Sequence, residues 1–332
     1  MEFVVGGIAA MGAGFFTNPM EVVKTRLQLQ GELQSKGVYT VHYRNFFHAM
    51  YTVAKVDGIA ALQKGLVPAL WYQLALNGVR LGAYQFAENQ GWTLNSEGQT
   101  SAPKSVVIGA LAGCAGSFTG SPLYLVKTHL QSQAANSIAV GHQHQHNGMG
   151  EALAGIYRKH GIQGLWRGVN GSMSRVLVGS AAQLSTFTLT KEWLEEKHVF
   201  KPNSLMNTIL GSMLCSIVAG ILMTPFDVIS TRLYNQGVDK NGKGLIYSGV
   251  YDCFNKTMKA EGFNGFYKGF TASYARLGPH FILTLLFWDI LKDFQKRLSS
   301  SDTRSSPQIK PVAYDLRDLK DGGLMDKGVI KV

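Results

Sequence analysis

Three arginines lie inside long segments that are otherwise poor in charge. Arg80 falls within 65–89, Arg175 within 168–193 and Arg276 within 269–294. A guanidinium group binds the paired oxygens of a carboxylate or a sulfate through two parallel hydrogen bonds and keeps its charge. Ionisable side chains inside an apolar segment usually face an aqueous cavity and mark a substrate path. Three such groups favour a small dianion over a cation or a neutral solute.

The segments that must position these arginines have the composition of membrane spans. The 332-residue chain has 32 Lys and Arg against 21 Asp and Glu, a formal net charge of +11, yet only 16% of its residues are charged. That composition excludes a disordered chain, and three cysteines exclude a disulfide scaffold. Runs without Asp, Glu, Lys or Arg cover 3–20, 105–126 and 202–226. About 20 apolar residues cross a bilayer as a helix, and the many glycines in these runs would let such helices pack closely.

An internal repeat divides the chain into three similar units. Pro19, Pro122 and Pro225 are 103 residues apart, within PMEVVKTRLQ, PLYLVKTHLQ and PFDVISTRLY. A second element recurs as DGIAALQKGL at 57–66, HGIQGLWRGV at 160–169 and EGFNGFYKGF at 261–270. Each unit is expected to hold a long helix kinked at its proline, a loop with a short helix, and a second long helix. We predict repeats at 1–92, 103–196 and 203–298, and a mobile polar tail at 299–332.

These motifs resemble the mitochondrial carrier family, also called solute carrier family 25. The resemblance covers residues 1 to about 298 and rests on Pro-x-Asp/Glu-x-x-Lys/Arg repeated three times with the downstream aromatic-basic-glycine element. The segments 121–128 and 175–184 are most similar to the branch of members 34 and 35, with the fungal oxaloacetate/sulfate carrier as a relative. The resemblance implies an all-α membrane protein with six transmembrane helices in three pseudo-symmetric repeats and short matrix helices. It also implies a monomer in the mitochondrial inner membrane, with cardiolipin as a structural lipid.

In this family an acid of one repeat pairs with a base of the next and closes a gate on the matrix side. The pairs implied here are Glu21–Lys127, Asp227–Lys24 and Tyr124–Ser230. The third pair carries no charge and offers at most one neutral hydrogen bond, so we expect a weaker gate than three ion pairs would make. Gln28 and Gln131 occupy the positions of residues that brace the pairs, and Tyr234 occupies the third such position.

The corresponding motif for a gate on the cytoplasmic side is degenerate. Its positions include Gln85, Lys191, Asp289 and Lys292. Gln85 could contact Lys191, whereas Asp289 would face Glu88, which is unfavourable. We therefore expect the state that is open to the cytoplasm to predominate when substrate is absent.

The resemblance also implies a substrate site near the middle of the membrane. Three contact points lie seven residues after Gly65, Gly168 and Gly269, and steps of four and eight residues stay on the same helical face. The resulting set is Tyr72, Leu76, Arg80, Arg175, Gly179, Gln183, Arg276, His280 and Thr284. None of these positions is acidic, so the three arginines are expected to lack a counter-charge. His280 could carry a proton with the anion, or it could be a packing residue after Gly278-Pro279.

Several signals are weak or leave alternatives open. His142, His144 and His146 alternate in the 133–149 loop without fixed second ligands, which indicates a low-complexity loop rather than a metal site. No nucleophile–base or zinc signature is present, so we expect a transporter for small anionic metabolites, with no enzyme activity, metal or cofactor. An antiporter of dicarboxylates or sulfur oxoanions is the leading interpretation, and an anion or proton leak of the uncoupling type is the alternative. A nucleic-acid-binding protein is disfavoured by the long uncharged runs.

Overall fold

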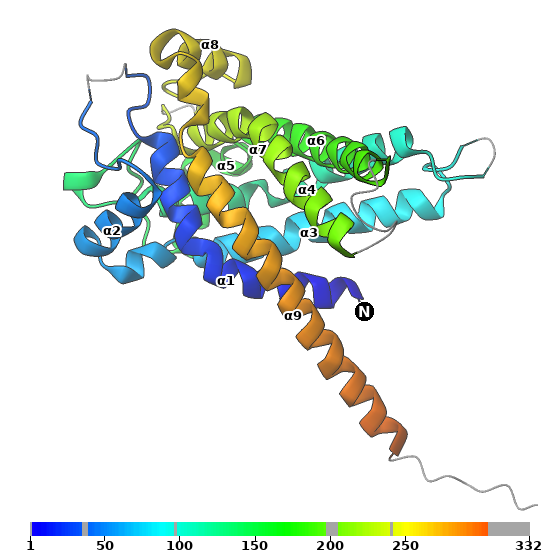
Figure 1. The fold of residues 1–332 in the computed structure, drawn as a ribbon. Coiled ribbons are helices and arrows are strands. Elements are labelled where there is room, and N and C mark those ends of the chain that lie inside the picture. Colours follow the sequence, from blue (N-terminus) through cyan, green and yellow to red (C-terminus); the bar gives the residue numbers. More distant parts are fainter. Residues whose placement is uncertain (1, 35–38, 96–97, 197–204, 240–241, 305–332) are drawn as a thin grey trace, which may run out of the picture. The chain divides into compact units, whose positions relative to one another are not determined.

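The protein is described by a computed structural model, which covers residues 2–34, 39–95, 98–196, 205–239 and 242–304. A succession of a long, a short and a second long helix occurs three times along the described chain (Figure 1). The long helices are α1 (Glu2–Leu29), α3 (Leu66–Asn89), α4 (Ala102–Ser132), α6 (Val169–Glu196), α7 (Leu205–Asn235) and α9 (Phe270–Arg304). The short ones are α2 (Phe46–Val56), α5 (Met149–Leu165) and α8 (Val250–Glu261), with 3-10 turns η1 (Ile59–Gln63), η2 (Asn136–Ile138) and η3 (Phe263–Tyr267). Within the described residues, β structure is limited to two isolated bridges.

The long helices have the length and surface expected of helices in lipid. The shortest has 24 residues and the longest has 35. Among the described helices, Pro103–Ser132 and Ile217–Asn235 are long and apolar enough to cross a membrane by length and composition. Large apolar side chains such as Phe16, Leu111 and Phe118 are exposed on α1 and α4. Extended exposed apolar surface of this kind suits contact with lipid or with another protein.

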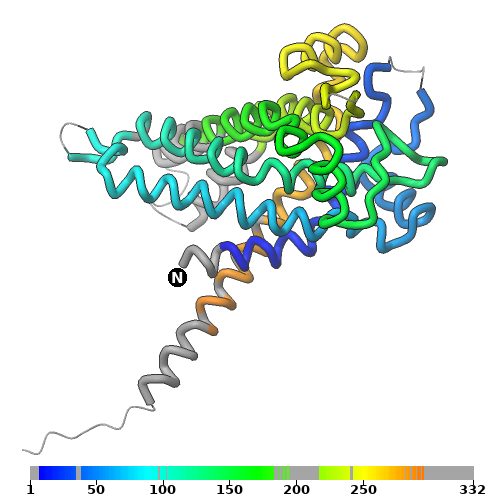
Figure 2. Tube along the Cα trace, turned by 180° about the vertical axis from the view of Figure 1, so that it is seen from behind, coloured from blue at the N-terminus to red at the C-terminus, as the bar shows by residue number. Residues whose placement is uncertain are grey.

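The three prolines of the repeat lie inside the first long helix of each unit. Pro19 is within α1, Pro122 within α4 and Pro225 within α7. Figures 1 and 2 show that α1 changes direction along its length. A proline inside a helix removes one backbone hydrogen bond and allows such a bend.

Glycines allow the long helices to approach closely. The most extensive contacts join α3 with α4 and α6 with α7, and α4 also packs on α6. A Cβ atom at Gly116 of α4 would lie 2.5 Å from the backbone oxygen of Leu76 in α3, and one at Gly113 would lie 2.8 Å from Val176 of α6. The small residues of α4 are therefore required by its two neighbours, as in other membrane helix contacts.

The glycine that begins the second long helix of each repeat adopts a left-handed conformation. The φ angles of Gly65, Gly168 and Gly269 are +72°, +83° and +77°, which favour glycine. A side chain from the first long helix of another repeat packs on each of them: Gln131 on Gly65, Tyr234 on Gly168 and Gln28 on Gly269. These three contacts link the repeats in a cyclic order.

Buried apolar residues form three clusters at the C-terminal halves of α1, α4 and α7. One cluster includes Val23 and Leu27 with Phe46 of α2, a second includes Leu125 with Ile156 of α5, and a third includes Ile229 with Phe266 of η3. The chain divides into two compact units, Met1–Leu291 and Lys292–Val332. All three clusters belong to the first unit, which also carries the site described below.

Candidate functional site

Two of the expected ion pairs between repeats are present in the structure. Lys24 of α1 pairs with Asp227 of α7, and Lys127 Nζ of α4 lies 2.6 Å from Glu21 Oε2 of α1. All four side chains are at most 16% exposed. Each pair joins the first long helix of one repeat to that of another, just beyond the prolines.

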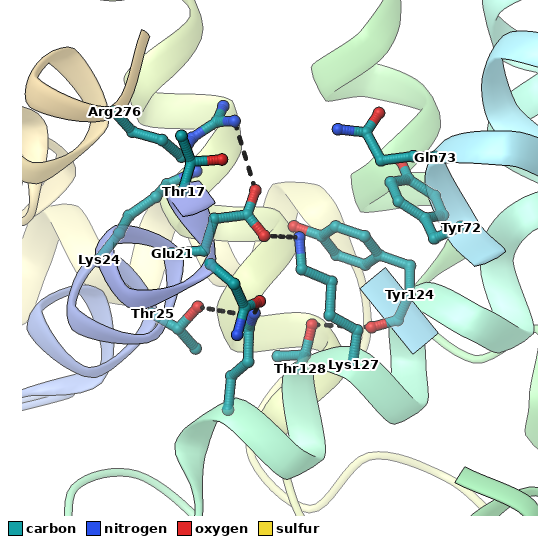
Figure 3. A network of polar contacts seen from close by, with 12 residues as sticks. Thr17, Glu21, Lys24, Thr25, Tyr72, Gln73, Tyr124, Lys127, Thr128 and Arg276 are labelled. Atoms are coloured by element: carbon teal, nitrogen blue, oxygen red, sulfur yellow. Dashed lines mark hydrogen bonds and ion pairs between the residues drawn. The ribbon is translucent and has the colours of Figure 1, made fainter. Parts of the chain in front are cut away.

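Two arginines of the expected substrate site also contact these acids, which corrects the expectation that they lack a counter-charge. Arg276 Nη1 lies 3.4 Å from Glu21 Oε1, and Arg175 Nε lies 3.8 Å from Asp227 Oδ1. Figure 3 shows Lys127 and Arg276 approaching the two different oxygens of Glu21. Every position of the expected substrate site lies on the second long helix of a repeat. Both acids lie on first long helices, so they were not part of that expected site. Each carboxylate is thus shared between a lysine and an arginine.

The third expected pair, Tyr124 with Ser230, is absent, and an aromatic contact takes its place. The hydroxyl of Ser230 is buried and has no hydrogen-bond partner. The ring of Tyr124 packs between Tyr72 and Tyr234, with centroids 4.9 Å from each. The guanidinium of Arg175 lies 5.3 Å from the Tyr124 ring centroid, close enough for a cation–π contact. The contacts of Tyr124 are thus made by its ring with two other tyrosines, and not with Ser230.

The two expected brace residues behave differently. Gln28 Nε2 donates a hydrogen bond of 2.9 Å to Asp227 Oδ2 and its side-chain oxygen Oε1 accepts one from the Thr231 hydroxyl, so it supports the Lys24–Asp227 pair. Gln131 instead accepts from Thr25 and donates to Asn18. The expectation that Gln131 braces the Glu21–Lys127 pair is therefore wrong, because its amide is directed to α1 side chains outside that pair.

Three positions of the expected substrate site lie on α3, namely Tyr72, Leu76 and Arg80. Tyr72 is buried, and its hydroxyl accepts a hydrogen bond of 2.9 Å from Arg175 Nη2. Leu76 is partly buried against the cluster around Tyr72. Arg80 is half-buried, and within the described part of the chain it has neither an ion pair nor a hydrogen bond. Of the three arginines in the expected site, Arg80 is therefore the one without a counter-charge among the described residues.

The remaining positions of that set make local contacts. Gly179 is buried against α7, where a Cβ would lie 2.6 Å from the sulfur of Met223, so it serves helix packing and does not face an open site. The side chain of Gln183 lies outside the described residues. Thr284 donates its hydroxyl to the backbone oxygen of His280 in its own helix. His280 Nδ1 lies 3.1 Å from Thr17 Oγ1, and because Thr17 already donates to Ala13, the imidazole is the donor in this bond.

At the other end of the bundle, only part of the expected cytoplasmic gate is described. Gln85 is exposed and donates to Glu88 and Asn89 on its own helix rather than to Lys191. The side chains of Lys191 and Asp289 lie outside the described residues, and Lys292 belongs to the second unit.

A family model described as mitochondrial carrier protein matches the chain three times, at residues 1–91, 98–198 and 201–299. The chain belongs to the mitochondrial carrier family. Members of this family are transporters rather than enzymes, and the carrier is a multi-pass protein of the mitochondrial inner membrane. In the described residues, three repeats with six long helices therefore form the all-α fold that the sequence predicts.

Curated relatives extend over most of the carrier. Solute carrier family 25 member 35 of Mus musculus is 55% identical over 294 residues, which cover 89% of the chain and 98% of the relative. The mitochondrial oxaloacetate transport protein of Saccharomyces cerevisiae is 38% identical, with 87% of each chain covered. Mitochondrial citrate transporter E of Aspergillus niger is also 38% identical, over 89% of the chain and 94% of the relative.

Sequence reasoning missed a second layer of ion pairs in the carrier. Arg26 Nη1 lies 2.6 Å from Asp57, and Arg232 Nη1 lies 2.6 Å from Glu261, with all four side chains almost fully buried. The repeat spacing was a sufficient signal, because both arginines stand seven residues after the repeat proline and both acids directly precede a glycine of the second element. These pairs tie a first long helix to the following short helix in the first and third repeats.

Proposed function

We propose that this carrier exchanges small dianions across the inner membrane by alternating access. The proposed substrates are dicarboxylates such as oxaloacetate or malate, and sulfur oxoanions such as sulfate or thiosulfate. The observation that carries the proposal is Arg80, a half-buried guanidinium without a partner among the described residues. A cation removed from water without a partner is unfavourable, and an anion relieves that cost. The printed names of the relatives that transport oxaloacetate and citrate support an anionic carboxylate class.

The shared carboxylates suggest how binding is coupled to opening. Arg276 and Arg175 contact Glu21 and Asp227, the acids of the two inter-repeat ion pairs. A dianion that binds these arginines replaces the protein carboxylates, and each acid then keeps only its lysine. Because one carboxylate replaces another on each arginine, the exchange adds little net electrostatic cost. Binding therefore loosens the matrix gate without trapping the substrate. Transport is fast only if the substrate stabilises the transition between the two states more than it stabilises either end state.

The experiment is exchange in reconstituted vesicles loaded with counter-substrate. A panel of malate, oxaloacetate, sulfate, thiosulfate, phosphate, ATP and aspartate is expected to rank dianions first. Arg80→Ala and Arg175→Ala should each lower the rate about tenfold or more, since loss of a buried charge contact is worth at least ~1.4 kcal/mol. Arg44→Ala, at an exposed residue of the loop before α2, is the matched control and should leave the rate unchanged. Preference for ATP, or wild-type rates for Arg80→Ala, would overturn the proposal.

The alternative is an uncoupling-type anion or proton leak. The observation that favours it is the uncharged third position of the matrix gate, where Tyr124 packs between tyrosines. The same vesicles separate the two functions, because exchange requires internal counter-substrate and a leak does not. Flux into empty vesicles equal to flux into loaded ones would replace the antiport proposal by the leak.

A further inference from the structure

The second repeat lacks the buried ion pair that the other two repeats share. Arg26 and Arg232 pair with Asp57 and Glu261 in the first and third repeats. The residues at the same repeat positions in the second are His129, which is 103 residues from each arginine, and His160. Neither an arginine nor an acid is available there, so another interaction must occupy this buried place.

Two histidines of the loop after α4 occupy it. The ring of His144 stacks on that of His129 with centroids 3.5 Å apart and planes at 9°. The ring of His146 lies 5.7 Å from His129 at 10°. His129 is 1% exposed, and His144 and His146 are partly buried.

The hydrogen bonds of two of these rings leave their Nδ1 atoms free. His129 Nε2 lies 2.9 Å from the backbone oxygen of Tyr234, and His144 Nε2 lies 2.9 Å from that of Asn235. A carbonyl only accepts, so each Nε2 carries the proton and each Nδ1 keeps a lone pair. His129 Nδ1 and His146 Nε2 are buried and have no hydrogen-bond partner. Histidines that bind metals are commonly held in this way, by a carbonyl on the opposite nitrogen.

We propose that His129, His144 and His146 form a binding site for a divalent transition-metal ion of the zinc class. Three imidazoles without a carboxylate suit Zn²⁺, Cu²⁺ or Ni²⁺ and do not suit Ca²⁺ or Mg²⁺. One ligand atom from each residue lies within 4.8 Å of the others. Nitrogens at 2.0–2.1 Å from a tetrahedral ion are about 3.3 Å apart. The two loop histidines therefore turn out of the stack toward His129 when the ion binds.

Arg167 limits the affinity of this site. Its Nη2 lies 3.4 Å from His129 Nε2, so a positive charge lies against the ring that would hold the ion. Like charges at this range repel unless they are screened by water. Replacing Arg167 by glutamine should therefore tighten metal binding.

The ion would take over the structural role of the missing ion pair. It would join α4 to the 133–149 loop, and the carbonyls of Tyr234 and Asn235 would connect the same site to the end of α7. The site differs from the substrate site both in residues and in ligand chemistry, so it can be tested without transport.

The test is Zn²⁺ titration of the full-length carrier in detergent after chelator treatment, followed by calorimetry. Cobalt absorption reports the tetrahedral nitrogen site. One ion per chain is expected, and His144→Gln and His146→Gln should each weaken binding about tenfold or more, in the range seen when metal-site residues are altered. His142→Gln, in the same tract but outside the group, is the matched control, and Arg167→Gln should bind more tightly.

Two outcomes would overturn the proposal. One is wild-type protein that takes up no Zn²⁺ even at a large excess of the ion over protein. The other is equal affinity in His146→Gln and His142→Gln. Because both loop variants leave α4 intact, a melting curve in chelator shows that each is folded before its affinity is compared.

Discussion

At the scale of single residues, the two shared carboxylates distinguish this carrier. Glu21 and Asp227 each hold a lysine on one oxygen and an arginine nearer the other. Removing one partner of a buried pair leaves the other charge uncompensated, which costs more than the pair gains in net stability. Neutralising either of these acids would leave two cations, a lysine and an arginine, without a counter-charge.

Glu21→Gln tests this sharing. The variant should be destabilised by about 3 kcal/mol, because Lys127 and Arg276 both lose their counter-charge. Substrate anion should then raise its melting temperature more than that of the wild type, since the ligand supplies the missing negative charge. Thermal unfolding in detergent with and without malate measures both effects. Glu88→Gln, at an exposed residue of α3, is the control, and an equal ligand shift in all three proteins would contradict the prediction.

Glu261 gives a pH-dependent prediction outside the membrane segments. Burial raises the pKa of this carboxyl, but hydrogen bonds and charges from Arg232 and Lys268 outweigh burial and lower it. A lowered pKa stabilises the fold above the unfolded value, near about 4.3, and this stability is lost as pH falls through the folded value.

Glu261→Gln should therefore melt at a lower temperature than the wild type at pH 7. The difference should shrink as the pH falls below about 4, when the wild-type carboxylate is protonated as well. Melting curves between pH 7 and pH 3.5 measure it. Asp252→Asn, which removes an exposed pair with Lys256, should change little. A constant difference at every pH would show that Glu261 acts through shape alone.

The sequence predicts well those residues that occur at the same position in each of the three repeats. Glu21–Lys127 and Asp227–Lys24 follow from three copies of one motif. The contacts of Arg175 and Arg276 with those acids were missed because they cross between the first and second long helices, which no single motif contains. The histidine cluster was missed because His144 and His146 were considered as a loop tract, apart from His129 on the preceding helix. The repeat register assigns Tyr124 to the third inter-repeat position. The sequence does not predict its packing, because that depends on Tyr72 and Tyr234 from two other helices.

At the scale of elements, close helix contacts depend on positions where any side chain meets backbone. Gly116 is such a position, because the obstacle is the Leu76 carbonyl, which cannot rotate away. The sequence predicts a small-residue face on α4, but the partner helix and the tight position within that face are set by packing.

Gly116→Ala should therefore destabilise the carrier by about 2 kcal/mol or more, in the range for overpacked sites. Gly82→Ala on α3, where a Cβ would meet nothing within 4 Å, should be neutral or stabilise by up to about 1 kcal/mol through helix propensity. Melting temperatures of the purified variants measure both. Equal effects would mean that helix propensity, and not the α3–α4 contact, governs these positions.

At the scale of the whole molecule, the ion pairs and the aromatic contact join the first long helices of the three repeats at the end of the bundle that we propose faces the matrix. We expect this closed matrix side to predominate without substrate. An Asn77→Cys reporter on α3, in a chain with Cys114, Cys215 and Cys253 replaced by serine, should react with an impermeant thiol reagent from the cytoplasmic side. Asn136→Cys, exposed near the end of α4, should react from the matrix side.

Added substrate should slow labelling at position 77 from the cytoplasmic side, because it populates the opposite state. Labelling rates in oriented vesicles provide the measurement, and position 136 provides the control for reagent access. Faster labelling of position 77 from the matrix side in the absence of substrate would contradict the expected resting state.

The tyrosine contact at the third position of the gate gives transport an unusual dependence on temperature. Exposing aromatic surface to water raises the heat capacity, whereas exposing polar surface lowers it. Separation of Tyr124 from Tyr72 and Tyr234 therefore adds a positive activation heat capacity to a step that is otherwise ionic. The apparent activation enthalpy of exchange rises as the membrane warms, and an Arrhenius plot of the rate is curved where a gate of three ion pairs would give a straighter line.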